Sequence, residues 1–222
     1  MSVWAVLVAA GRGERLGDER PKAFARLGGR VLLAESLERL DASQWVDAIV
    51  VVAPPEWEEA VIVLAEELAA GKVAASIAGG AARADSVRAG LAEVPEDAAV
   101  VLVHDAARPL LSDEVIERVL QPLAEGFDGA VPGLPVADTV KRVKGGVVVE
   151  TLDRTELVAV QTPQAFLAPA LRSALASDDS SQATDCASSV EARGGRVKVV
   201  EGDPRLLKIT TPADLAQVES WL

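Results

Sequence analysis

Hydrophobic residues along this chain come in short runs of strand length, separated by longer segments in which they recur at helical spacing. The expected strands are residues 3–8, 48–52, 73–77, 99–103, 129–132 and 196–200. The expected helices are residues 31–40, 56–70, 84–93, 113–125, 166–176, about 185–193, and a last one that starts behind Thr211, with a polar loop expected at 177–184. Because nearly continuous apolar strands alternate with helices, we predict an α/β fold: a Rossmann-like, mostly parallel sheet with helices on both faces.

The alternation breaks between residues 136 and 160. Residues 140–143 and 147–149 predict two short strands, and Lys144-Gly145-Gly146 between them is a glycine turn typical of a β-hairpin. We expect this hairpin, an insertion of about residues 136–158, to project as an arm from a single domain of residues 1–222. A lone two-stranded hairpin is marginally stable in water, so the arm either packs on a second subunit or folds back on its own domain.

Composition narrows the class of protein. The formal net charge of −12 argues against nucleic acid as a partner, although local cations can still bind a small anion. No apolar run is long enough to cross a membrane, and the first residues lack the pattern of a secretory signal. The single cysteine, Cys186, excludes an internal disulfide framework. These features predict a soluble cytoplasmic protein that contacts no membrane.

The segment after the first strand has the composition of a phosphate-binding loop. Gly11 and Gly13 allow a tight turn whose backbone N–H groups approach a ligand closely, and Arg15 and Lys22 add positive charge. A polyphosphate is therefore the expected ligand. A dinucleotide fingerprint is disfavoured because Leu16 stands where its third glycine belongs, and no Gly-Lys-Ser/Thr ends the loop as in a Walker A sequence. A tight turn without a ligand is the alternative.

Two other strand ends carry candidate chemistry. Asp105 directly follows an apolar strand, where it would hold Mg²⁺ that bridges phosphates; capping its own loop is the alternative. His104, the only histidine, has no sequence partner that would make it a base, so we expect a structural role. Gly80 and Ser86 stand in a small-residue turn suited to a base and a ribose, with a helix cap as the simpler interpretation of Ser86. Lys208 follows two leucines and points either into a cleft or into solvent.

Several of these segments occur together in one known family. The patterns are Ala-Ala-Gly-x-Gly-x-Arg (9–15) before Pro-Lys (21–22), Gly-Gly-x-x-Arg-x-Asp-Ser-Val (79–87), His-Asp-Ala-Ala-Arg-Pro (104–109), Asp-Thr-Val (138–140), an arginine at 154 before Gln-Thr-Pro-Gln (161–164), Thr-Asp (184–185) and Lys-Ile-Thr-x-Pro-x-Asp-Leu (208–215). Over residues 9–215 the chain resembles the 2-C-methyl-D-erythritol 4-phosphate cytidylyltransferase family of non-mevalonate isoprenoid synthesis. The resemblance implies transfer of CMP from CTP to methylerythritol phosphate with release of pyrophosphate.

The resemblance also implies roles for individual residues. Arg15 and Lys22 match the transition-state stabilisers, and Asp105 matches the ligand of Mg²⁺ on the nucleotide. Residues matched to CTP binding are Ala10, Gly11, Gly13, Gly80 and Ser86, and those matched to the acceptor phosphate are Arg108, Thr139, Arg154 and Lys208. In the family the hairpin joins a homodimer and carries Thr139 and Arg154 into the neighbouring site.

The chain departs from the family pattern at three places. Ala81 stands where many relatives have an acid, Cys186 where they usually have Asp or Glu, and Leu206 near the position of an Asn. These departures bear on base recognition and loop geometry. The resemblance leaves two further interpretations open, a ribitol-5-phosphate cytidylyltransferase and a non-catalytic nucleotide-binding module.

Overall fold

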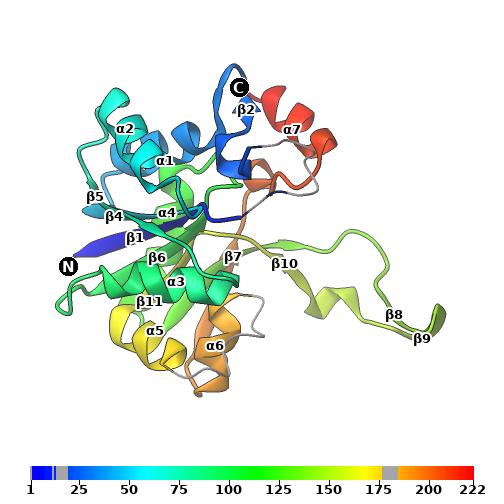
Figure 1. The fold of residues 1–222 in the computed structure, drawn as a ribbon. Coiled ribbons are helices and arrows are strands. Elements are labelled where there is room, and N and C mark those ends of the chain that lie inside the picture. The colour runs from blue at the N-terminus through cyan, green and yellow to red at the C-terminus, as the bar shows by residue number, and fades with distance from the viewer. Residues whose placement is uncertain (1, 12, 14–19, 177–184) are drawn as a thin grey trace.

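The computed structural model describes residues 2–11, 13, 20–176 and 185–222. Eight of its described strands form one central sheet in the order β10-β7-β11-β6-β1-β4-β5, and β12, which lies off this path, also pairs with β7 (Figure 1). The strands of this sheet are β1 (Val3–Val8), β4 (Ala48–Ala53), β5 (Val73–Ala78), β6 (Val100–Asp105), β7 (Gly129–Pro135), β10 (Val158–Val160), β11 (Gln164–Leu167) and β12 (Val197–Glu201). The helices are α1 (Leu32–Ala42), α2 (Glu58–Glu67), α3 (Arg83–Ala92), α4 (Asp113–Ala124), α5 (Ala168–Leu175), α6 (Cys186–Ala192) and α7 (Pro212–Glu219).

The sheet is mostly parallel, as predicted. β1 pairs in parallel with β4 and β6, and β4 with β5, while β12 runs parallel to β7. Only β10 and β11 run against their neighbours. The chain moves outward from β1 to β4 and β5 and then returns to place β6 on the other side of β1. Such a change of direction opens a crevice at the carboxyl ends of the two central strands.

Helices cover both faces of the sheet (Figure 1). One apolar cluster packs α1, α2 and α4 on the first face, and a second packs α3, α5 and α6 on the other. Neighbouring residues of β1 divide between them, since Leu7 joins the first cluster and Val6 the second. Both side chains are fully buried. Because both faces of the strands are covered, their sequences are nearly continuous runs of apolar residues.

A third, smaller cluster holds the C-terminal helix. Val218 of α7 packs with Leu27 of β2 (Arg26–Leu27), with Leu32 and with Ile209. β2 pairs with β3 (Arg30–Val31) in a short hairpin just after Lys22. The start of α7 is the predicted one: Thr211 accepts the Asp214 N–H, and Asp214 accepts the Thr211 N–H. The last helix is thereby fixed beside the β2–β3 hairpin.

Two predicted helix boundaries are wrong. The helix expected at 166–176 begins only at Ala168, because the residues before it form β11 and pair with β6. Phe166 is fully buried in that strand. The helix expected at 56–70 is shorter, since Glu56 and Ala69 adopt φ angles of 71° and 53° at its two ends. The loop expected at 177–184 lies outside the described residues.

The hairpin projects from the domain as an arm (Figure 1). β8 (Lys141–Lys144) and β9 (Val147–Thr151) form a separate two-stranded sheet. Gly145 and Gly146 join them with φ angles of 57° and 80°, the positive values that a tight hairpin turn requires. Four arm valines, at positions 143, 147, 148 and 149, are 54–65% exposed. The arm therefore does not fold back on its own domain.

Candidate active site

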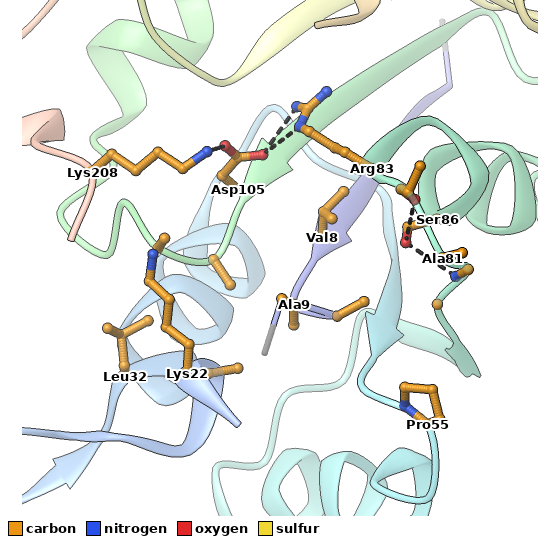
Figure 2. A pocket seen from close by; sticks show the side chains of 18 residues that line it. Val8, Ala9, Lys22, Leu32, Pro55, Ala81, Arg83, Ser86, Asp105 and Lys208 are labelled. Carbon is orange, nitrogen blue, oxygen red and sulfur yellow. Dashed lines mark hydrogen bonds and ion pairs between the residues drawn. The ribbon is translucent and has the colours of Figure 1, made fainter. Parts of the chain in front are cut away.

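A pocket of about 700 Å³ opens at the carboxyl ends of β1, β4, β5 and β6. The loop after each of these strands contributes to its lining (Figure 2). Lys22 and, from near the C-terminus of the sequence, Lys208 also line it. Ligands of open α/β sheets bind at this position. The structure thus brings together the predicted residues Ala10, Gly11, Lys22, Gly80, Ser86, Asp105 and Lys208.

Lys22 is placed by close packing against the first loop. Gly13 has a φ of 72°, and a Cβ atom added there would lie 2.5 Å from the Cβ of Lys22. A side chain at position 13 would therefore displace the lysine, which explains the glycine. Lys22 begins the 3₁₀ turn η2 (Lys22–Phe24), and the buried ring of Phe24 stacks at a tilt on Trp57 with centroids 4.4 Å apart. Arg15 lies outside the described residues.

Glycines also shape the turn after β5. A Cβ at Gly79 would overlap the Cβ of Ala10, so the two loops approach each other as closely as backbone allows. Ser86 is buried, and its hydroxyl accepts the Gly80 N–H at 3.1 Å and donates to the Ala82 carbonyl at 3.2 Å. The hydroxyl thereby stabilises the turn itself while lining the pocket. The contact of Ser86 with a nucleoside stays a prediction.

Asp105 ends β6 at the floor of the pocket and binds two cations. Its Oδ2 accepts from Lys208 Nζ at 2.6 Å, and its Oδ1 accepts from Nε and Nη2 of Arg83 at 3.1 and 3.0 Å (Figure 2). Burial opposes ionisation of this carboxyl, but the charges and hydrogen bonds of Arg83 and Lys208 outweigh it and hold its pKa well below the usual range. Asp105 is therefore a carboxylate at neutral pH. The cleft orientation predicted as one alternative for Lys208 is the observed one.

Arg83 is the charged residue of the pocket lining that the sequence did not predict as a site residue. It is the first residue of α3, and its remaining Nη1 lies 3.7 Å from the Sγ of Cys186. Burial raises the pKa of that thiol to about 11, so Arg83 faces a neutral group there. The available signal was its position: an arginine at a helix start, directly after a strand and a glycine turn.

The Gln-Thr-Pro-Gln segment (161–164) holds three other segments that are distant in the sequence. Gln161 donates to the carbonyl of Asp203 and accepts its N–H, holding the segment that leads to Lys208. Thr162 accepts the Asp105 N–H, and Gln164 accepts the Cys186 N–H. These side chains are at most 5% exposed. Their polar character therefore serves the geometry of the site.

His104 has the structural role that we expected. It is fully buried, its Nδ1 lies 3.2 Å from Thr162 Oγ1, and its Nε2 lies 3.1 Å from the Arg108 carbonyl. Since a carbonyl only accepts, Nε2 carries the proton and Nδ1 accepts from the threonine. Burial lowers the pKa of His104 from 6.5 to about 4, so the ring is neutral at neutral pH.

This histidine should make the fold sensitive to mild acid. Between pH 6.5 and 4 the unfolded chain binds a proton at His104 that the folded chain does not, so the unfolding free energy falls as the pH falls. The slope should approach about 1.4 kcal/mol per pH unit. Urea denaturation at several pH values measures it, with His104→Gln as the matched variant because its carboxyl groups titrate as in the parent. Parallel pH profiles of the two proteins would contradict the assignment.

Three of the residues predicted to bind the acceptor phosphate do not line the pocket of their own chain. Arg108 donates from Nη1 to the Leu206 carbonyl at 2.5 Å and so supports the Lys208 segment. Thr139 and Arg154 are exposed near the base of the arm, where Arg154 donates to the carbonyl of Ala137. Their roles toward an acceptor stay predictions.

The charge of the pocket is opposite to that of the chain. Three cations line it among the described residues, Lys22, Arg83 and Lys208, against the single carboxylate of Asp105. The whole chain carries a formal charge of −12. A local excess of positive charge in an acidic protein indicates an anionic ligand.

The described residues form neither a metal-binding cluster nor a membrane-spanning helix. They contain no group of three or more His, Cys, Asp or Glu side chains arranged to hold a metal ion. No helix in the described part is both long and apolar enough to span a bilayer.

Comparison with known proteins gives the family. The family model for 2-C-methyl-D-erythritol 4-phosphate cytidylyltransferase matches residues 3–222. The chain belongs to this family. A relative of that name from Nocardia farcinica is 49% identical over 222 residues, covering 100% of this chain and 94% of its own. Another member, from Rhodococcus jostii, is 49% identical over 96% of this chain and 92% of its own.

Solved members of the family have the same fold. The structure of 2-C-methyl-D-erythritol 4-phosphate cytidylyltransferase from Thermus thermophilus is 34% identical, with a TM-score of 0.79 over 100% of this chain and 98% of that one. The 4-diphosphocytidyl-2C-methyl-D-erythritol synthase from Anaerococcus prevotii is 26% identical, with a TM-score of 0.85 over 99% and 97% of the two chains. The predicted fold class and family are both confirmed.

Proposed function

We propose that this protein transfers CMP from CTP to 2-C-methyl-D-erythritol 4-phosphate, giving 4-diphosphocytidyl-2-C-methyl-D-erythritol and pyrophosphate. It is a nucleotidyltransferase by family, and its relatives over nearly their whole length carry the name of this reaction. The observation that supports the proposal in the structure is the cationic pocket at the switch point of an acidic α/β domain. A nucleoside triphosphate and a phosphorylated polyol are both anions that such a pocket attracts.

The chemistry requires little beyond positioning and charge. A phosphate oxygen of the acceptor attacks the α-phosphorus of CTP, and the bond from that phosphorus to the bridging oxygen breaks as pyrophosphate leaves. The attacking oxygen is already anionic, so no general base is needed, which agrees with the buried neutral state of His104. Lys22, aimed across the pocket toward Asp105 and Lys208, is the described cation placed to stabilise charge on the reacting phosphate (Figure 2).

The residues of the pocket fit a divalent cation bound with the nucleotide. Asp105 is an ionised carboxylate at the pocket floor, and Mg²⁺ is commonly held by one or two carboxylates together with substrate phosphates. No acidic or histidine cluster accompanies Asp105 among the described residues, so the nucleotide phosphates would supply most of the ligands and the protein alone would bind the cation weakly through Asp105. When bound, Mg²⁺ would neutralise charge on the phosphates; Asp105 is the residue that would hold it.

A second subunit completes this proposal. The arm leaves Val143, Val147, Val148 and Val149 exposed on a lone hairpin, and an isolated hairpin of this kind is stabilised by packing on another chain. In a homodimer joined through the arms, Thr139 and Arg154 would reach the acceptor side of the neighbouring pocket, and Lys208 would contact the acceptor from its own chain.

We also propose a cytoplasmic location, because the single cysteine gives no internal disulfide.

The reaction is tested directly with purified protein. Incubation with CTP, Mg²⁺ and methylerythritol phosphate should release pyrophosphate in step with acceptor consumed. Ribitol 5-phosphate is the matched alternative acceptor, because it is also a short phosphorylated polyol. Turnover with ribitol 5-phosphate alone would overturn the acceptor assignment, and CTP binding without turnover on either acceptor would favour a non-catalytic nucleotide-binding module.

A further inference from the structure

The carboxylate of Asp105 is divided between two cations that approach it from opposite sides (Figure 2). Lys208 donates one hydrogen bond to Oδ2. Arg83 donates two, from Nε and Nη2, and both go to Oδ1. Paired donors on one oxygen are not the two-oxygen fork that arginine forms with carboxylates at its best. Both oxygens of Asp105 are therefore occupied, and any further ligand of Oδ1 must displace Arg83 from it.

Arg83 has little else to hold it on that side. Its other observed partner is the Sγ of Cys186 at 3.7 Å, a thiol that burial keeps neutral. The contacts described for Arg83 thus include one anion, Asp105. The backbone of Arg83 is fixed at the start of α3, where Asp85 accepts the Ala82 N–H, and Arg83 lines the pocket.

Two ligands of the proposed reaction would act on these groups in different ways. A divalent cation needs a lone pair of Asp105, and its charge repels a guanidinium bound to the same oxygen. The nucleotide brings phosphate oxygens, whose geometry matches the planar donors of arginine. Resting on the proposed function, we propose that Arg83 and a divalent cation compete for Oδ1 of Asp105, and that the arginine released by the cation binds a phosphate oxygen of CTP. Arg83 is then a nucleotide-binding residue in addition to those matched from the family.

If the cation displaces Arg83 from Asp105, the Arg83→Gln substitution should change the affinities for the cation and for CTP in opposite directions. Without nucleotide, Mn²⁺ should bind the variant about tenfold more tightly, because the competing charge is gone. With Mg²⁺ present, CTP should bind about tenfold more weakly, because charge-assisted hydrogen bonds to the phosphate are lost. Mn²⁺ binding is measured by electron paramagnetic resonance of the unbound ion, and CTP binding by calorimetry, both without the acceptor.

Cys186 gives an independent test outside the pocket lining. Cys186→Asp places a carboxylate beside Nη1 and should draw Arg83 away from Asp105, which shifts both affinities in the same directions as Arg83→Gln. Cys186→Ser is the matched control, since it is similar in size and neutral, and it should leave both affinities within twofold of the parent. If one variant does not fold by circular dichroism, the other carries the same two measurements.

The outcomes separate this inference from the proposed function. Unchanged Mn²⁺ affinity in Arg83→Gln, or losses of both affinities together, would show that Arg83 only supports the structure. Those binding measurements do not depend on the acceptor, so they decide the exchange even if the parent protein fails to release pyrophosphate. A parent protein that binds neither Mn²⁺ nor CTP would overturn both.

Discussion

Lys22→Ala should lower kcat about 10²–10³-fold while changing the Kd of CTP by only a few-fold. Lys22 lines the pocket opposite Asp105 and Lys208, where charge accumulates as the α-phosphate is displaced (Figure 2). A group that meets this charge stabilises the transition state more than the ground state, so its loss appears in kcat. Its Cβ, which packs by Gly13, is kept in alanine, so the loop retains its fit.

The measurement is steady-state pyrophosphate release together with CTP binding by calorimetry. Lys198→Ala is the matched control, because Lys198 lies over the ring of Phe127 at 5.5 Å on strand β12 and is not among the residues that line the candidate active site. It should leave both constants unchanged. Equal losses of turnover and CTP affinity in Lys22→Ala would instead assign this lysine to ground-state binding.

The sequence was sufficient for the parts of the site that depend on strand ends. The carboxyl ends of parallel strands lie at one edge of a sheet, so the glycine loop after β1, Asp105 after β6 and Gly80 after β5 had to meet. Lys208 was less determined, since it follows a 3₁₀ turn and not a parallel strand. The family resemblance supplied the roles of these residues, and the fold supplied their proximity.

The sequence did not predict contacts in which a side chain binds a segment that is distant in the sequence. Arg83 meets Asp105 across 22 residues and Cys186 across 103, and neither separation follows from hydrophobic periodicity. The second half of β11, residues 166–167, is predicted from the sequence as the start of a helix for a similar reason. Its residues 164–167 are apolar in part and precede helical spacing, and only pairing with β6 makes them a strand.

Mixed dimers should recover activity that neither parent variant has. We assume that the arm of one subunit carries Arg154 to the pocket of the other. In a heterodimer, the Lys22→Ala subunit then supplies an intact Arg154 to the pocket of the Arg154→Ala subunit, which has an intact Lys22. Random reassortment of Lys22→Ala with Arg154→Ala yields half heterodimers, each with one intact site of two, so about a quarter of the parent activity should return. Separate Lys22→Ala and Arg154→Ala dimers should each be nearly inactive.

The structure makes this outcome depend on the arm. Within one chain Arg154 donates to the Ala137 carbonyl at the base of the hairpin and does not line the pocket, so any contact with the acceptor needs a second chain. The control mixes Lys22→Ala with a Lys22→Ala/Arg154→Ala double variant, in which no dimer holds an intact Lys22 and no activity should return. Activity is measured after the mixture is dissociated and reassembled, with oligomeric state followed by light scattering. A mixture that forms heterodimers yet stays inactive would place Arg154 outside the neighbouring site, because every other requirement for that site is met in half of its dimers.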